Sequence, residues 1–234
     1  MMTFRHVAVS LLALVMSTGV ASAYNFSNYP FHYNINSDGE SVTVVGYGGG
    51  GGEVTIPSYA SRYDYFTESR KIYSVTAIGD SAFCDCTSIT KVTVDNNVKS
   101  IGKGAFEKCT GLKEVIIGNK VTSIGVGAFS YCDGLTSIQV YSGNENYTDA
   151  DCDAIIERKT NTLIAGCKNT TIPNGVKLIG DFAFYGCKGL TSVTIPESVK
   201  GIGKYAFYDC TGLTSVTIPN SLTSIGVSAF SGCI

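Results

Sequence analysis

Three acidic residues near the middle of the chain are the first candidates for acid–base chemistry. Asp151, Asp153 and Glu157 lie close together in the sequence, and paired carboxylates are the catalytic groups of glycoside hydrolases. They fall on the base and tip of a predicted β-hairpin, where acidic side chains are more often solvated. The only histidine after residue 23 is His32, so His-dependent nucleophilic catalysis depends on that one residue. We therefore predict that the protein is not an enzyme and uses no cofactor.

Phosphate and nucleic acid are also poor candidate ligands. The glycine run Gly48–Gly52 is followed by neither Gly-Lys-Ser nor Gly-Lys-Thr, so it lacks the phosphate-loop motif and is expected to form a hairpin tip. The chain has 17 basic and 19 acidic residues, a formal net charge of -2 and no basic run. A nucleic-acid-binding domain usually carries a basic patch. We therefore expect no nucleic-acid partner.

The nine cysteines are the other residues whose chemistry needs an explanation. Six of them occupy one position in a repeated phrase with a period of 23 residues, and no histidine lies nearby, which is not a zinc-ligand pattern. In stacked repeats such side chains point the same way, about 4.8 Å apart, whereas a disulfide needs opposed Cβ atoms. We predict buried free thiols and no metal site, although an exported protein favours disulfides. The six are Cys86, Cys109, Cys132, Cys187, Cys210 and Cys233.

The repeated phrase, IGxxAFxxCxxLxxVxIPxxV, runs through most of the chain. A fixed period of this size is typical of a solenoid, in which each copy covers the core of its neighbours. Leu190–Pro196 alternates apolar and hydroxyl residues and predicts a short strand closed by proline. Ala183–Cys187 predicts a tight helical turn. Ile-Gly begins the copies at Ile78, Ile101, Ile124, Ile179, Ile202 and Ile225, with steps of 23, 23, 55, 23 and 23 residues.

This phrase resembles that of the BspA-like leucine-rich repeat family of bacterial proteins, over roughly Ile78 to Cys233. The resemblance implies a β-rich leucine-rich-repeat solenoid of short parallel strands and tight helical turns, with an N-terminal β cap. It also implies a secreted or surface-exposed protein that adheres to host proteins or neighbouring cells.

The first 23 residues have the features of a secretory signal peptide. Arg5 and His6 precede the apolar run Val7–Met16, and Ala21-Ser22-Ala23 is a small-residue cleavage site. The apolar run is too short for a transmembrane helix; the alternative is a buried or anchoring helix. No later segment is apolar enough to span a bilayer, so we expect a secreted or cell-surface protein without a membrane span after signal removal.

The remaining chain divides into a cap and a repeat array. Residues 24–77 predict an N-terminal β cap with a degenerate repeat, and residues 78–234 predict the solenoid, with an enlarged copy at about 141–178. The array stops after Cys233–Ile234 without a capping segment, which suggests an open last turn or a shortened family member.

The enlarged copy predicts a hairpin with Lys159-Thr160 at its tip. In that register Glu157 faces Thr162 and Cys152 faces Cys167. We therefore predict a disulfide between Cys152 and Cys167.

The cap is rich in tyrosine, a residue that is favoured in binding patches but that also packs small β domains. We favour packing and leave a recognition surface as the alternative. The eight residues are Tyr24, Tyr29, Tyr33, Tyr47, Tyr59, Tyr63, Tyr65 and Tyr73.

The outer side of the stacked strands is the predicted binding surface, because solenoids bind through such extended faces. Its polar positions form ladders of side chains, and Thr191, Thr194, Thr214 and Thr217 represent them in the last copies. The predicted function is protein–protein interaction with an extracellular or host-surface protein. The alternative is a structural or carbohydrate-binding surface module. The sequence leaves the oligomeric state open.

The cleavage site gives a direct prediction. N-terminal sequencing of the exported protein should begin at Tyr24, because Ala21-Ser22-Ala23 precedes it. Recovery of secreted protein that retains Met1 would contradict the signal-peptide prediction.

The expected register of the hairpin gives a second testable prediction. Non-reducing peptide mapping of the exported protein should recover one linked pair, Cys152 with Cys167. The prediction fails if both thiols of the native exported protein react with an alkylating agent.

Overall fold

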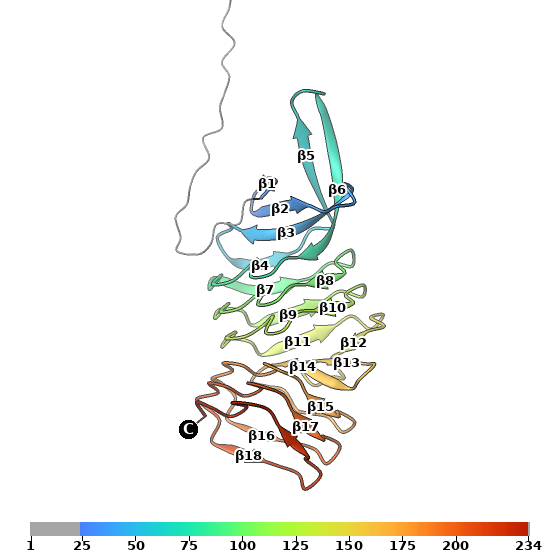
Figure 1. Ribbon diagram of the computed structural model, residues 1–234. Coiled ribbons are helices and arrows are strands. Elements are labelled where there is room, and N and C mark those ends of the chain that lie inside the picture. Colours follow the sequence, from blue (N-terminus) through green and yellow to red (C-terminus); the bar gives the residue numbers. More distant parts are fainter. Residues whose placement is uncertain (1–23, 234) are drawn as a thin grey trace, which may run out of the picture.

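The computed structural model describes residues 24–233 and shows a stack of thin β layers with an antiparallel cap at one end (Figure 1). The signal-peptide prediction for residues 1–23 lies outside the described residues. The described part contains nineteen β-strands and no helix. No helix there is long and apolar enough to cross a membrane.

The cap joins an antiparallel sheet to the first parallel layer. β1 pairs with β2 and β2 with β3, all antiparallel, while β3 pairs in parallel with β6. β5 and β6 form a long hairpin that projects beyond the cap in Figure 1. The strands are β1 (Phe26–Asn28), β2 (Phe31–Ile35), β3 (Ser41–Tyr47), β4 (Gly52–Thr55), β5 (Tyr59–Asp64) and β6 (Ser69–Ile78).

The next three copies form what we call the first block. Two parallel sheets run along it, one in the order β3-β6-β8-β10 and the other in the order β4-β7-β9-β11. Val92 pairs with Val115 and Val115 with Ile138, so corresponding residues of successive copies are in register. The strands are β7 (Ile89–Thr93), β8 (Ser100–Ile101), β9 (Glu114–Ile117), β10 (Ser123–Ile124) and β11 (Ser137–Val140).

The enlarged copy forms a hairpin layer between two cores. It consists of β12 (Tyr147–Thr148), β13 (Ala154–Glu157) and β14 (Thr162–Gly166). Ile155 belongs to the core of the first block, whereas Ala154 and Ile156 belong to the core of the following copies. Since successive strand residues point to opposite faces, β13 seals one core with one face and the next core with the other.

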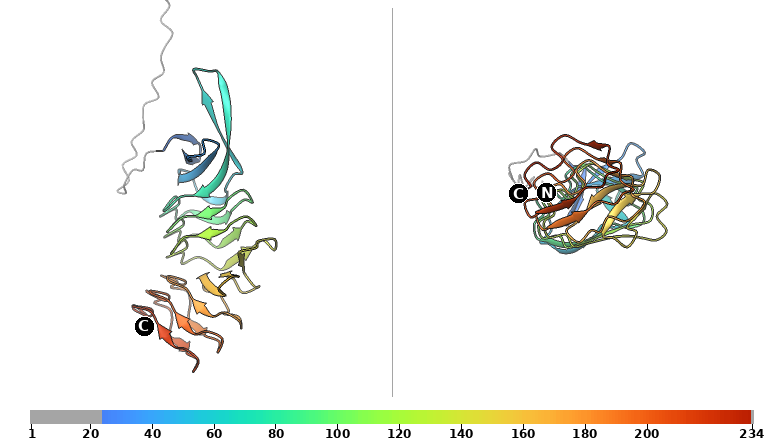
Figure 2. Two further views of the ribbon diagram at one scale, coloured as in Figure 1. Left: turned by 45° about the vertical axis from the view of Figure 1, so that its right-hand side comes forward. Right: turned by 90° about the horizontal axis from the view of Figure 1, so that it is seen from below.

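The last copies form the second block, with the strands β15 (Leu178–Ile179), β16 (Ser192–Thr194), β17 (Gly201–Ile202), β18 (Ser215–Thr217) and β19 (Ser224–Ile225). One sheet continues from the hairpin in the order β14-β15-β17-β19, and β16 pairs only with β18. Figure 2 shows the layers stacked on one another, with the second block following the hairpin.

The predicted helical turns are wrong. In each copy two residues four positions apart have left-handed backbone, such as Tyr205 (φ 56) and Asp209 (φ 55). A left-handed residue interrupts the run of right-handed residues that a helix needs. The backbone N–H of the residue midway between these two points out of the layer. In this copy that residue is Phe207, whose N–H donates to the Ala229 carbonyl oxygen of the next copy at 2.7 Å. The turn side is therefore a third series of hydrogen bonds between layers.

Stacked phenylalanines fill the centre of each block. The ring centroids of Phe83, Phe106 and Phe129 are 4.9 and 5.4 Å apart. In the second block Phe207 is fully buried and lies between Phe184 and Phe230, at 4.8 and 5.1 Å. These separations match the spacing of adjacent strands. The layer spacing therefore allows one aromatic ring per copy to stack.

All nine cysteines are free thiols in the structure. Four of the six repeated cysteines donate a hydrogen bond to the turn of the preceding layer. Cys109 Sγ lies 3.1 Å from the Phe83 carbonyl oxygen, and Cys210 Sγ lies 3.0 Å from that of Phe184. Burial raises the pKa of the Cys109 thiol to about 12. A thiol with such a pKa is almost entirely protonated at neutral pH and is a poor nucleophile.

The hairpin register differs by one residue from the register expected at its base. Glu157 pairs with Thr162 as expected, but a bulge between Ile155 and Ile156 shifts the pairing, so Ala154 faces Gly166. Continuing this register places Asp153, and not Cys152, opposite Cys167. The Cys152 and Cys167 thiols lie in different core clusters and are unlinked in the structure. Their pairing stays a prediction.

The core assignment predicts very different effects for two substitutions. Phe207→Ala should lower the free energy of unfolding by about 3 to 5 kcal/mol, because it removes a buried ring from the stack. Thr194→Ala, at an exposed position of β16, should change it by no more than about 0.5 kcal/mol. Thermal or denaturant unfolding measures both, and equal shifts would contradict the assignment.

Candidate binding surfaces

Two of the three acidic residues singled out in the sequence, Asp153 and Glu157, form hydrogen bonds within the fold. The Asp153 carboxylate accepts a hydrogen bond from the Ile138 N–H at 3.3 Å, and Asp149 accepts one from the Val140 N–H at 2.8 Å. Both donors lie on β11, the last strand of its sheet. The two carboxylates thus accept hydrogen bonds from backbone N–H groups at the edge of the sheet, where no further strand pairs with β11. Glu157 accepts a hydrogen bond from the Thr160 hydroxyl at the hairpin tip, and Asp151 is exposed.

His32 is also held by its surroundings. Its Nδ1 lies 2.7 Å from the Ser27 hydroxyl, and its ring stacks on Tyr24 with centroids 4.3 Å apart. Burial lowers the pKa of His32. Within residues 24–233, no three His, Cys, Asp or Glu side chains are grouped as metal ligands would be.

The four threonines predicted as a binding surface lie together on β16, β18 and the residues before them. Thr194 pairs with Thr217, and the Thr214 N–H donates to the Thr191 carbonyl oxygen at 3.1 Å. All four are exposed, whereas Val193 between them is buried. We call these four residues the threonine ladder. They form a small, uncharged polar surface.

The ladder does not continue over the whole array. The strands of the first block form a separate four-stranded sheet, and the hairpin layer lies between it and the β16–β18 pair. The first block also carries charge on this side: Lys113 stands at the position equivalent to Thr214. Beside it, Lys91 and Glu114, at the positions equivalent to Ser192 and Ser215, form an ion pair at 3.1 Å. The two faces therefore differ in chemistry as well as in position.

The cap tyrosines divide into a packing set and an exposed set. Tyr33 and Tyr73 are buried, in agreement with the packing interpretation. Tyr47 is half-buried and packs against Phe83, with ring centroids 5.3 Å apart. The other five do not follow that interpretation, because they are exposed, by 44 to 84%, and Phe66 beside them is fully exposed. Along β5 only Ala60 is buried, so most of this strand belongs to the outer surface. The exposed tyrosines are Tyr24, Tyr29, Tyr59, Tyr63 and Tyr65.

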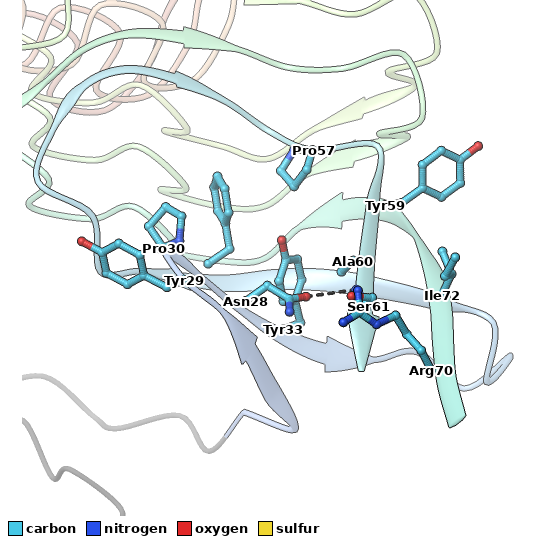
Figure 3. A pocket seen from close by; sticks show the side chains of 11 residues that line it. Asn28, Tyr29, Pro30, Tyr33, Pro57, Tyr59, Ala60, Ser61, Arg70 and Ile72 are labelled. Atoms are coloured by element: carbon cyan, nitrogen blue, oxygen red, sulfur yellow. Dashed lines mark hydrogen bonds between the residues drawn. The ribbon is translucent and has the colours of Figure 1, made fainter. Parts of the chain in front are cut away.

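A hollow of about 560 Å³ lies between the β1–β2 connection and the β5–β6 hairpin (Figure 3). Its lining is mostly aromatic and aliphatic and includes Tyr29, Tyr59 and Ile72. Arg70 is the one charged side chain that lines it. Asn28 closes one side by accepting a hydrogen bond from the Ser61 N–H at 3.0 Å. This hollow was not predicted, because its walls are distant in sequence.

A second, smaller hollow of about 440 Å³ lies on the turn side, where the two blocks meet. Phe182 and Tyr185 line it, and the Tyr131 and Tyr185 rings touch edge to face, with centroids 5.0 Å apart. Gly186 has φ 70, and a Cβ there would collide with the Tyr131 ring. Glycine is therefore required for the blocks to approach at this point.

Comparison with known proteins agrees with this architecture. The family model of the BspA type leucine rich repeat region matches residues 54–153 and 155–234, with six copies. A search of curated proteins finds no match. Several solved structures of bacterial proteins are similar to the chain.

One is a leucine rich cell surface protein from Faecalibacterium prausnitzii A2-165, 24% identical over 91% of this chain and 81% of that chain, with a TM-score of 0.45. Another is the leucine rich repeat protein of T. pallidum, 25% identical over 89% of this chain and 88% of that chain, with a TM-score of 0.49. A third is a leucine-rich repeat protein from Bacteroides ovatus, 20% identical over 90% of this chain and 93% of that chain, with a TM-score of 0.34.

The family model covers well over half of the residues, and the resemblance seen in the repeated phrase is confirmed. The chain belongs to the family of proteins with the BspA type leucine rich repeat region.

Proposed function

We propose that this protein is a secreted or surface-exposed, non-enzymatic binding protein that adheres to a protein of the host or of a neighbouring cell. The observation that supports the proposal is the threonine ladder: four exposed hydroxyl side chains on β16, β18 and the residues just before them, beside the buried Val193 and the half-buried Val216. Stacked repeats hold such side chains at fixed spacing, and repeat proteins use such faces for binding.

The chemistry of the ladder favours shallow contacts over a deep site. Its residues carry no charge, and the Thr214 hydroxyl already donates to the Thr191 carbonyl oxygen at 3.3 Å. Each hydroxyl thus offers a partner little more than one weak contact. Binding through such a surface needs several contacts at once, and we expect weak to moderate affinity.

A carbohydrate-binding or structural module is the alternative function, since hydroxyl-rich surfaces also suit sugars. Competition separates the two functions. Captured protein that stays bound in the presence of simple sugars supports protein recognition, whereas release by those sugars supports the alternative.

The ladder gives a substitution test. The exported chain is presented to immobilised extracellular-matrix and cell-surface proteins, beside a variant with arginine at Thr191, Thr194, Thr214 and Thr217. The variant should lose binding and stay folded, because these side chains are exposed, while each single substitution should do little. A matched control carries four arginines at exposed threonines elsewhere and should bind as the parent does: Thr87, Thr110, Thr122 and Thr223.

The dependence of binding on salt concentration is a second measurement in the same experiment. Because the ladder is uncharged, binding should change only modestly up to 1 M salt, where the Debye length is about 3 Å. If the fourfold ladder variant binds as the parent does while a variant of the cap tyrosines does not, recognition lies in the cap and the ladder hypothesis is wrong.

A further inference from the structure

The β5–β6 hairpin has a free strand edge. β5 pairs only with β6. The Val75 N–H of β6 donates to the carbonyl oxygen of Ser58, the residue directly before β5, at 2.9 Å. In antiparallel pairs, hydrogen-bonded and non-hydrogen-bonded positions alternate. The register therefore turns the main-chain groups of alternate β5 residues away from β6, namely those of Tyr59, Ser61 and Tyr63.

Asn28 shows that this edge accepts a partner. Its side-chain oxygen receives the outward Ser61 N–H at 3.0 Å, in the place that a neighbouring strand's carbonyl would take. The next outward groups, the Ser61 carbonyl and the Tyr63 N–H, have no hydrogen-bond partner among residues 24–233. An unpaired edge of this kind is a template for an added strand.

The side chains beside this edge form an uncovered apolar face. Ser61 pairs with Ile72 and Tyr63 with Arg70, so these four side chains share one face of the hairpin. Ile72 is 63% and Tyr63 is 44% exposed. The opposite face packs against the cap, where Ala60 and Tyr73 are buried. Tyr and Arg are the residues most enriched at the energetic centres of protein interfaces.

The hollow beside the edge favours a ligand that carries a negative charge. Arg70 is its one charged lining residue, and among residues 24–233 no carboxylate lies within 4 Å of the Arg70 side chain. Lys71, next to it in sequence, points to the other face and is paired with Glu40 at 2.9 Å. An arginine without a partner beside aromatic walls suits a carboxylate that is carried close to an apolar group.

From these observations we propose that the cap binds an extended peptide segment of another protein, which adds as a strand to the free edge of β5. The peptide main chain pairs with the Ser61 carbonyl and the Tyr63 N–H, an apolar side chain enters the hollow, and an acidic side chain pairs with Arg70. Main-chain pairing supplies affinity in this mode of recognition, and pockets for side chains supply specificity. The surface is separate from the threonine ladder, so either proposal can fail without the other.

A displayed library of random short peptides, selected on the exported chain, tests this inference. The enriched peptides should combine an apolar and an acidic residue and contain no proline in the paired stretch. A synthetic peptide of the enriched sequence should bind Arg70→Ala about tenfold more weakly than the parent chain. Arg62→Ala is the matched control, because Arg62 has the same charge but lies on the opposite face of β5; its affinity should stay within about twofold.

Amide hydrogen exchange tests directly whether the main chain of the peptide pairs with β5. Saturation with the peptide should slow exchange of the Tyr63 amide, while the Arg62 amide, which faces β6, should not change. Three results would overturn the proposal: no peptide is enriched, the two arginine variants weaken binding equally, or the Tyr63 amide exchanges as in the free chain. Dimerisation of the exported chain through β5 would also overturn it, since a second copy would then occupy the edge.

Discussion

The structure depends on hydrogen bonding between layers that repeat in strict register. One copy is too thin to enclose a core, so its apolar residues are buried only because the next copy covers them. Three series of bonds fix the stack: two parallel sheets and the turn side, where Phe207 N–H reaches the Ala229 carbonyl oxygen. The stacked phenylalanines and the Cys210 thiol lie between them. A change of spacing within one copy would disturb all three series together.

The hairpin layer shows how the stack tolerates an irregular copy. It replaces a regular layer by a pair of antiparallel strands that are apolar on both faces, with Ile155 in one core and Ile156 in the other. β11 loses its next neighbour at this point, and the carboxylates of Asp149 and Asp153 take two of its amides. Asp153, one of the acidic residues considered as catalytic groups in the sequence, thus serves together with Asp149 to satisfy this edge. The hairpin also separates the β16–β18 face from the strands of the first block.

Much of the stack follows from the sequence because identical spacing dictates identical pairing, as the register of Val92, Val115 and Ile138 shows. The turns were mispredicted because at least one of the two left-handed residues in each copy is not a glycine, and at Tyr205 and Asp209 neither is, so the sequence carries little local signal for left-handed backbone. The β-bulge beside Ile155 is not indicated by any sequence pattern either. It shifts the strand register by one residue, so Cys152 and Cys167 are not directly opposite each other as expected. Of the candidate surfaces, the ladder was predictable from the period. The hollow in the cap was not, because Tyr29 and Ile72 line it together only after the four intervening strands, β2 to β5, have folded.

The central claim is that register between copies, and not the number of copies, holds the stack together. Unfolding of two deletion variants tests it most directly. Removal of residues 101–123 joins Ser100 to Ile124 and leaves every later copy in phase, together with the hairpin layer, the cap and the threonine ladder. This variant should unfold cooperatively with a modestly lower midpoint. Removal of residues 101–112 deletes less of the chain but breaks the phase, and this variant should show no cooperative transition. Equal cooperative unfolding of the two variants would contradict the account.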